Sequence, residues 1–203
     1  MVLFMFLDLL GALASLVSTL FFIRLSTKAW PLGILATVLN GWLYWHKGIY
    51  ADMVLEVCYF LSMCYGWSLW HKSESTKNQP KQKPLGRLNR IQGTYLMIAS
   101  AALFALIYYL LHTLTHSTVA VLDAATTSLS LLAQWFMCHK IMATWIVWFI
   151  TDLLYAVMYL HKQLPFHSAL MLIYTGLAVI GYITWSQKNR KFLATETTAQ
   201  FTV

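Results

Sequence analysis

Long apolar stretches alternate with short polar ones along almost the whole chain. Seven stretches have the length and hydrophobicity of membrane-spanning helices; they cover residues 4–23, 30–46, 51–70, 92–111, 118–138, 143–160 and 166–186. Residues 71–90 form the only long polar stretch, and the breakers Pro80, Pro84 and Gly86 make it typical of a linker. No basic leader precedes the first apolar run, which favours a first span over a cleavable signal.

The amino-acid composition agrees with this pattern. Hydrophobic residues make up 59% of the 203 residues, charged residues only 10%, and the mean hydropathy is +0.62. Soluble domains contain about 25% charged residues, so the sequence predicts an all-α integral membrane protein with seven transmembrane helices. The cysteines Cys58, Cys64 and Cys138 lie within apolar runs, and their odd number argues against a disulfide framework.

Positive charge is distributed unequally between the two sides of the predicted membrane. If the N-terminus lies outside, the only outer basic residues are Lys47 and Lys162. The other twelve Lys and Arg residues then lie on the inner side; they are Arg24, Lys28, the six of residues 71–90, Lys140, Lys188, Arg190 and Lys191. The positive-inside rule therefore predicts an outer N-terminus and a cytoplasmic C-terminus. This topology explains the net charge of +7 better than nucleic-acid binding does.

The chain resembles itself when it is shifted by 115 residues. Identical pairs include Asp8 with Asp123, Trp30 with Trp145, Tyr59 with Tyr174, Gly66 with Gly181 and Trp70 with Trp185, and Tyr44, His46 and Lys47 with Tyr159, His161 and Lys162. The spans therefore divide as three, one and three, and the single span lets both triplets cross the membrane in the same direction. Transporters built as such a parallel repeat bind substrate near the membrane midplane, where the halves meet.

The repeat suggests a division of the chain into four segments. Residues 1–72 are predicted to form the first three-helix bundle, and residues 113–190 the second. Between them, residues 73–112 are predicted to form a basic cytoplasmic linker and a linker helix, and residues 191–203 form a cytoplasmic tail. The predicted architecture is thus two parallel three-helix bundles joined by one helix.

The sixth span carries an acid in the middle of an apolar helix. Trp145, Trp148, Asp152 and Tyr155 recur at steps of three or four residues, which places them on one helical face. A carboxylate within the membrane costs at least ~2.5 kcal/mol, so it usually faces a bundle interior or a wet cavity. Aromatic rings beside one carboxylate suit a flat cation, through stacking, cation–π contact and charge pairing. The alternative is a packing stripe with one hydrogen-bonded acid, and this helix alone favours neither.

Polar residues on three other spans extend the candidate binding site. Asn40 lies on the matching face of the second span, and Glu56 and Tyr59 share a face of the third. Thr127 and Gln134 share a face of the fifth span, and the Gln134 side chain suits an amide or a ribose hydroxyl. For Asn40 the alternative is a hydrogen bond between helices. For Glu56 the alternative is an interfacial acid wetted by outside solvent.

Several other functional classes lack their motifs in this chain. There is no HExxH or other metal-ligand spacing, no P-loop and no GxSxG nucleophile motif. We therefore expect no enzyme activity, no metal and no cofactor. A retinal receptor would need a lysine in its last span, and residues 166–186 contain none.

Several stretches resemble the PnuC family of bacterial vitamin transporters. They read WPLGILATVLNGWLYWHKGIYADMVLE, CYGWSLW, LDAATTSLSLLAQWFMCHKI, TWIVWFITDLLYAVMYLHKQL and GYITW, and the resemblance covers the chain from about Leu7 to Lys188. Its most specific piece is the Trp-x-x-Trp-x-x-x-Asp/Asn pattern, present as Trp145, Trp148 and Asp152. The resemblance implies two three-helix bundles joined by a linker helix, an organisation similar to the SWEET sugar transporters.

The resemblance also implies a function. It implies facilitated uptake of a small cationic aromatic vitamin through the bacterial inner membrane, with nicotinamide riboside as the first candidate and thiamine as the second. Phosphorylation in the cytoplasm would trap the vitamin, so no ion gradient is needed. Homo-oligomerisation stays open. The substrate-binding role carries over to Trp145, Trp148, Asp152 and Gln134, while Asn40, Glu56, Tyr59, Tyr155 and Tyr174 fit the same faces.

Overall fold

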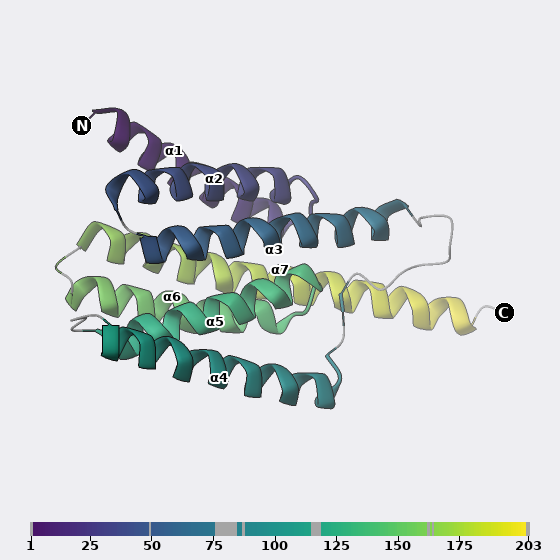
Figure 1. The fold of residues 1–203 in the computed structure, drawn as a ribbon. Coiled ribbons are helices and arrows are strands. Elements are labelled where there is room, and N and C mark those ends of the chain that lie inside the picture. Colours follow the sequence, from purple (N-terminus) through teal and green to yellow (C-terminus); the bar gives the residue numbers. More distant parts are fainter. Residues whose placement is uncertain are drawn as a thin grey trace. The chain divides into compact units, whose positions relative to one another are not determined.

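The computed structural model describes residues 2–48, 50–75, 85–86, 88–114, 119–161, 163 and 165–201. Helices account for nearly all of this part of the chain (Figure 1). They are α1 (Val2–Ile23), α2 (Ala29–Lys47), α3 (Tyr50–Ser75), α4 (Arg90–Leu114), α5 (Ala120–Cys138), α6 (Ala143–His161) and α7 (Pro165–Phe201). Each corresponds in order to one predicted span, so the predicted all-helical fold is confirmed.

Two of the helices continue well beyond the predicted spans. α3 extends through Ser75 and α7 through Phe201, whereas hydrophobicity predicts ends at residues 70 and 186. Neither extension contains Pro or Gly, the residues that most strongly interrupt a helix. Hydrophobicity therefore identifies the membrane-length part of each helix but not the residue at which the helix ends.

Four helices in the described part of the chain have the length and composition of membrane spans. Their apolar windows are Phe6–Ile23 in α1, Arg90–Thr113 in α4, Ala143–His161 in α6 and Pro165–Thr195 in α7. No residue of the α4 window is buried, and the side chains of Tyr95 and Met97 are 70% and 72% exposed. Such extensive apolar exposure is unusual in a soluble protein, and it is expected where lipid surrounds the helix.

The chain forms two compact units. The first contains α1, α2, α3 and α7 from Ile183 onward, and the second contains α4, α5, α6 and α7 up to Tyr182. In the first unit the rings of Phe22, Trp30 and Trp70 meet edge to face, with centroids 4.7, 5.3 and 5.8 Å apart. The core of the second unit contains Phe136, Met137, Ile141, Trp145 and Ala178.

The turn between α1 and α2 is closed by a residue in the left-handed conformation, Leu25, whose φ is 57°. The N–H of Ser26 donates to the Phe21 carbonyl at 3.0 Å, and the N–H of Leu25 donates to the Phe22 carbonyl at 2.9 Å. These two bonds define a Schellman motif at the end of α1. A non-glycine residue at the left-handed position costs ~1–2 kcal/mol, so the surrounding contacts must stabilise this turn.

The turn between α5 and α6 has the same backbone structure. Lys140, 115 residues after Leu25, is left-handed with a φ of 54°. The N–H of Ile141 donates to the Phe136 carbonyl at 3.0 Å, and the N–H of Lys140 donates to the Met137 carbonyl at 3.1 Å. The internal repeat predicted from side-chain identities therefore extends to backbone geometry.

The turns that follow α2 and α6 repeat one another in the same way. Gly48 and Gln163 are equivalent positions, and both are left-handed, with φ values of 70° and 58°. The N–H of Gly48 donates to the Trp45 carbonyl at 3.2 Å, and the N–H of Gln163 donates to the Leu160 carbonyl at 3.0 Å. Only the first of these turns has the glycine that marks such a position in a sequence.

In each triplet a tryptophan of the second helix packs against a glycine of the third. A Cβ atom built on Gly66 would lie 2.1 Å from the ring of Trp30, and one built on Gly181 would lie 2.5 Å from the ring of Trp145. Each ring thus occupies the space that a side chain would need, which lets the two helices approach closely. The distance along the chain from tryptophan to glycine is the same in both triplets. This equal spacing reflects one packing contact that the protein uses twice.

We expect Gly66→Ala and Gly181→Ala each to lower the free energy of unfolding by ~1–3 kcal/mol, the usual cost of overpacking. Gly176→Ala is the matched control, because the added Cβ would meet no atom within 4 Å apart from its chain neighbours and the backbone of its own helix. This control should be at least as stable as the parent protein, since alanine is the better helix former. Thermal unfolding of the purified proteins measures all three. An equal loss of stability in Gly176→Ala would contradict the role of the ring contact.

Candidate functional site

One face of α6 carries aromatic and acidic side chains, and this face is turned away from the apolar exterior. Trp145 and Asp152 are buried, with 2% and 6% of their surfaces exposed, and Trp148 and Tyr155 are half-buried. The opposite face is apolar and exposed; it consists of Ile146, Phe149, Ile150, Leu153, Val157 and Leu160. The predicted grouping of Trp145, Trp148, Asp152 and Tyr155 on one face is therefore present in the structure.

Two buried side-chain hydrogen bonds hold α6 in this rotation. Thr144 Oγ1 donates to the carbonyl of Ala133 on α5 at 2.8 Å. Ser168 Oγ on α7 donates to the carbonyl of Ala156 at 2.9 Å. With the Trp145 ring packed against Gly181, α6 is anchored to both of its neighbours in the triplet. The position of its polar face is thus determined by contacts at both ends of the helix.

The carboxylate of Asp152 is the most unusual group on this face. Within the described part of the chain, no side chain or backbone group donates a hydrogen bond to it, and no Lys or Arg pairs with it. The neighbouring Thr151 donates to its own helix, at the carbonyl of Val147. Burying a carboxylate is costly unless it is paired or hydrogen-bonded. The site therefore favours a partner that brings positive charge or donors.

A second polar group lies in the first unit, where α1, α2 and α3 approach one another. Asn40 Nδ2 donates to Glu56 Oε1 at 3.3 Å, so the structure brings together two of the predicted site residues. A Cβ on Gly11 of α1 would lie 2.3 Å from Asn40 Oδ1, which shows how closely α1 covers this pair. Tyr59 is half-buried, on α3 one turn after Glu56. The bond from Asn40 to Glu56 joins α2 to α3, and the substrate-binding role of both residues stays a prediction.

The other predicted site residues belong to the second unit. Gln134 of α5 is buried, whereas Thr127 of α5 and Tyr174 of α7 are half-buried. Tyr155 stacks on Tyr159, with ring centroids 5.9 Å apart and 16° between the ring planes. No three His, Cys, Asp or Glu side chains come together as a metal site among the residues that the structure describes. The predicted binding residues are thus divided between the two units.

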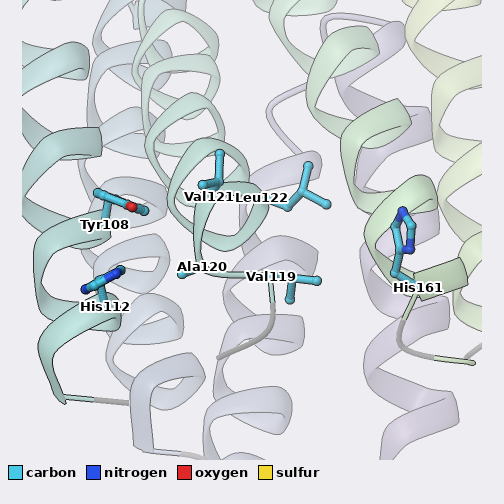
Figure 2. A pocket seen from close by; sticks show the side chains of 7 residues that line it. All are labelled: Tyr108, His112, Val119, Ala120, Val121, Leu122 and His161. Atoms are coloured by element: carbon cyan, nitrogen blue, oxygen red, sulfur yellow. The ribbon is translucent and has the colours of Figure 1, made fainter. Parts of the chain in front are cut away.

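The second unit also contains a pocket that sequence reasoning missed (Figure 2). It has a volume of about 410 Å³ and is lined by Tyr108 and His112 of α4, by Val119–Leu122 around the start of α5, and by His161 of α6. This size lies within the ~300–1,000 Å³ of small-molecule sites. No predicted site residue lines it. Its two histidines, His112 and His161, lie in the last turns of α4 and α6. Amphipathic side chains are common at such positions because the membrane interface favours them, so the sequence does not distinguish a pocket histidine from an interfacial one.

Comparison with known proteins agrees with the resemblance seen in the sequence. The structure is similar to one described as "Crystal structure of the Vitamin B3 transporter PnuC", with a TM-score of 0.70, 20% sequence identity, and coverage of 92% of this chain and 83% of that chain. At this identity the likeness shows the fold. No curated protein matches the chain. The family model described as nicotinamide mononucleotide transporter matches residues 5–187. The chain therefore belongs to the nicotinamide mononucleotide transporter family, and it is a multi-pass membrane transporter rather than an enzyme.

Proposed function

We propose that the protein carries nicotinamide riboside into the cell by facilitated diffusion. It would do so across the bacterial inner membrane, with a periplasmic N-terminus and a cytoplasmic C-terminus. The observation that carries this proposal is the buried carboxylate of Asp152, which lies on an aromatic face and receives no hydrogen bond from the described residues. Nicotinamide riboside has a flat, positively charged ring that would pair with this carboxylate. Thiamine also has a cationic ring and is the second candidate.

The distribution of basic residues favours the riboside over its phosphorylated form. α5 and α6 contain no Lys or Arg, and α2 and α3 carry them only near their ends, at Lys47 and Lys72. A buried phosphate is normally bound by Arg, Lys or a helix N-terminus. Beside Asp152 a phosphate would instead be repelled. The vitamin would therefore enter without its phosphate and be phosphorylated, and so trapped, in the cytoplasm.

We assign different roles to the two indoles of α6. Trp145 is buried against Gly181, so it positions the helix. Trp148 is half-buried one helical turn before Asp152, so its ring is available to stack on a substrate. Tyr155 follows Asp152 by three residues and would border the same ring. A cation held between aromatic faces and a carboxylate is favoured by both stacking and charge.

We expect Asp152→Asn to weaken the binding of nicotinamide riboside by ~1–3 kcal/mol, because the amide keeps the shape of the side chain but loses its charge. Titration calorimetry on purified protein measures this change. Reduced nicotinamide riboside, whose ring is uncharged, should bind the parent protein more weakly than the oxidised form. Asp152→Asn should abolish that preference.

Asp52→Asn is the matched control for charge removal, because Asp52 is exposed at the start of α3. It should leave the affinity unchanged. If the parent protein and Asp152→Asn bound both nicotinamide riboside and thiamine equally well, the α6 face would be a packing surface and the site would lie elsewhere. Binding of thiamine without nicotinamide riboside would make thiamine the substrate.

The proposed roles of the two indoles predict opposite effects of truncation. Trp148→Ala should weaken substrate binding by ~0.5–2 kcal/mol, through lost stacking and cation–π contact, with little effect on unfolding. Trp145→Ala should lower the free energy of unfolding by ~3–5 kcal/mol. Calorimetry and thermal unfolding separate the two effects. Trp148→Ala combined with Asp152→Asn should cost less than the sum of the single changes, because both side chains hold one ring. Full additivity would contradict a shared ligand.

Facilitated diffusion predicts that transport stops at equal concentrations. Within the described spans three acids are buried or half-buried: Glu56 in the first unit, and Asp123 and Asp152 in the second. Asp123 lies in the first turn of α5 and Asp152 in the middle of α6, so we propose that these acids do not form a relay for a coupled proton. Proteoliposomes should therefore load labelled nicotinamide riboside only until the inner and outer concentrations match. An imposed pH gradient should not change this end point. Accumulation above the outer concentration under that gradient would rule out a uniporter.

A further inference from the structure

The α1–α2 turn is held by side chains of α7 within the first unit. Trp185 Nε1 donates to the carbonyl of Phe22 at 3.1 Å, and Lys188 Nζ donates to the carbonyl of Arg24. The Trp185 side chain is fully buried. Lys188 follows it by three residues, which places both donors on one face of α7. Because both acceptors belong to one turn, α7 cannot rotate at this point without breaking both bonds.

The α5–α6 turn, in the second unit, is held by a different part of the chain. The N–H of Gly86 donates to the carbonyl of Lys140 at 3.1 Å, and Gly86 forms an isolated bridge with Ile141. Leu85 beside it is buried. A Cβ on Gly86 would lie 2.3 Å from the carbonyl oxygen of His139, so only glycine allows this close approach.

The two sets of contacts reach equivalent turns but different carbonyls within them. The turns are equivalent because Leu25 and Lys140, the left-handed residue of each, are separated by 115 residues. The segments that make the contacts are not equivalent: one is the later part of α7, and the other precedes α4. The repeat therefore supplies two similar turns, and unrelated parts of the chain hold them. This difference is a source of asymmetry in an otherwise repeated scaffold.

We propose that these contacts are two separate clasps, Trp185 with Lys188 on the α1–α2 turn and Leu85 with Gly86 on the α5–α6 turn. Each clasp holds the turn of its own compact unit closed, and each releases without the other because they share no residue. Transporters built from repeated bundles work by movement of one bundle against the other. Separate clasps let one turn loosen while the other stays closed. The inference rests on membership of a transporter family and is independent of which substrate is carried.

Cysteines at equivalent positions in the two turns would report their opening. Ser26→Cys and Ile141→Cys are separated by 115 residues, and each is introduced into protein whose native cysteines Cys58, Cys64 and Cys138 are replaced by alanine. The protein is placed in lipid nanodiscs, where both membrane sides are accessible, and is labelled with a polar maleimide. The rate of labelling measures how often each turn opens, and the experiment needs no substrate.

We expect each clasp variant to accelerate labelling at its own turn alone. Lys188→Met keeps the aliphatic stem but removes the donor, so Ser26→Cys should be labelled about five-fold faster, the population change that ~1 kcal/mol produces. Labelling of Ile141→Cys should be unchanged in the same background. In Gly86→Ala the labelling of Ile141→Cys should be faster and that of Ser26→Cys unchanged. The acceleration should be larger than in Lys188→Met, because the added Cβ cannot fit against the His139 carbonyl. Each variant is thus the control for the other.

Three further variants distinguish a clasp from general loosening of the fold. Lys188→Arg should restore the slow labelling, because a guanidinium also donates, and Trp185→Phe should act like Lys188→Met. Lys191→Met removes an exposed charge one turn further along α7 and should have no effect. Equal acceleration at both turns, or none in Lys188→Met, would overturn the proposal. If Trp185→Phe does not fold, Lys188→Met decides the outcome alone.

Discussion

In each half of the protein a tryptophan ring occupies the space beside a glycine of the next helix, and the placement of the polar side chains depends on this contact. In the second half, Trp145 is directed into the bundle because Gly181 leaves room for its ring. Asp152 lies seven residues further along α6, about two helical turns, and so faces the same way. Rotation of α6 toward lipid would expose the carboxylate, at a cost of at least ~2.5 kcal/mol. This packing contact, together with the hydrogen bonds of Thr144 and Ser168, therefore keeps the acid inside.

The repeat supplies the scaffold twice but gives the two halves different polarity. Thr37 stands at the position equivalent to Asp152, and its hydroxyl donates to the carbonyl of Ile34 on its own helix at 2.9 Å. In the same half, Glu56 accepts a hydrogen bond from Asn40. The first half thus satisfies these polar groups internally, whereas Asp152 receives no donor from the described residues. An asymmetric cationic ligand is suited to such a difference, because its charged ring has one preferred side.

Several features of the site were predictable from the sequence, and others were not. The shared face of α6 was predictable because the helical period alone places residues at steps of three and four together. The hydrogen bonds between helices were not. Ser18 Oγ donates to the Ala29 carbonyl at 2.8 Å in the first half, while in the second half Thr144 donates to the carbonyl of Ala133. These are equivalent positions with donor and acceptor exchanged, so a comparison of residue identities finds nothing conserved there.

The sequence by itself determined the number, order and repetition of the helices, because apolar length and helical period are properties of consecutive residues. It did not reveal that Leu25, Lys140 and Gln163 are left-handed, since only glycine signals that conformation reliably and the other contacts of each turn compensate for its cost. The tertiary structure also decided that Glu56 receives a hydrogen bond and that α7 and Gly86 hold the two turns. Such contacts depend on distances between groups far apart in the chain. Hydrophobic pattern specifies which face of a helix is buried but not which distant atom lies opposite it.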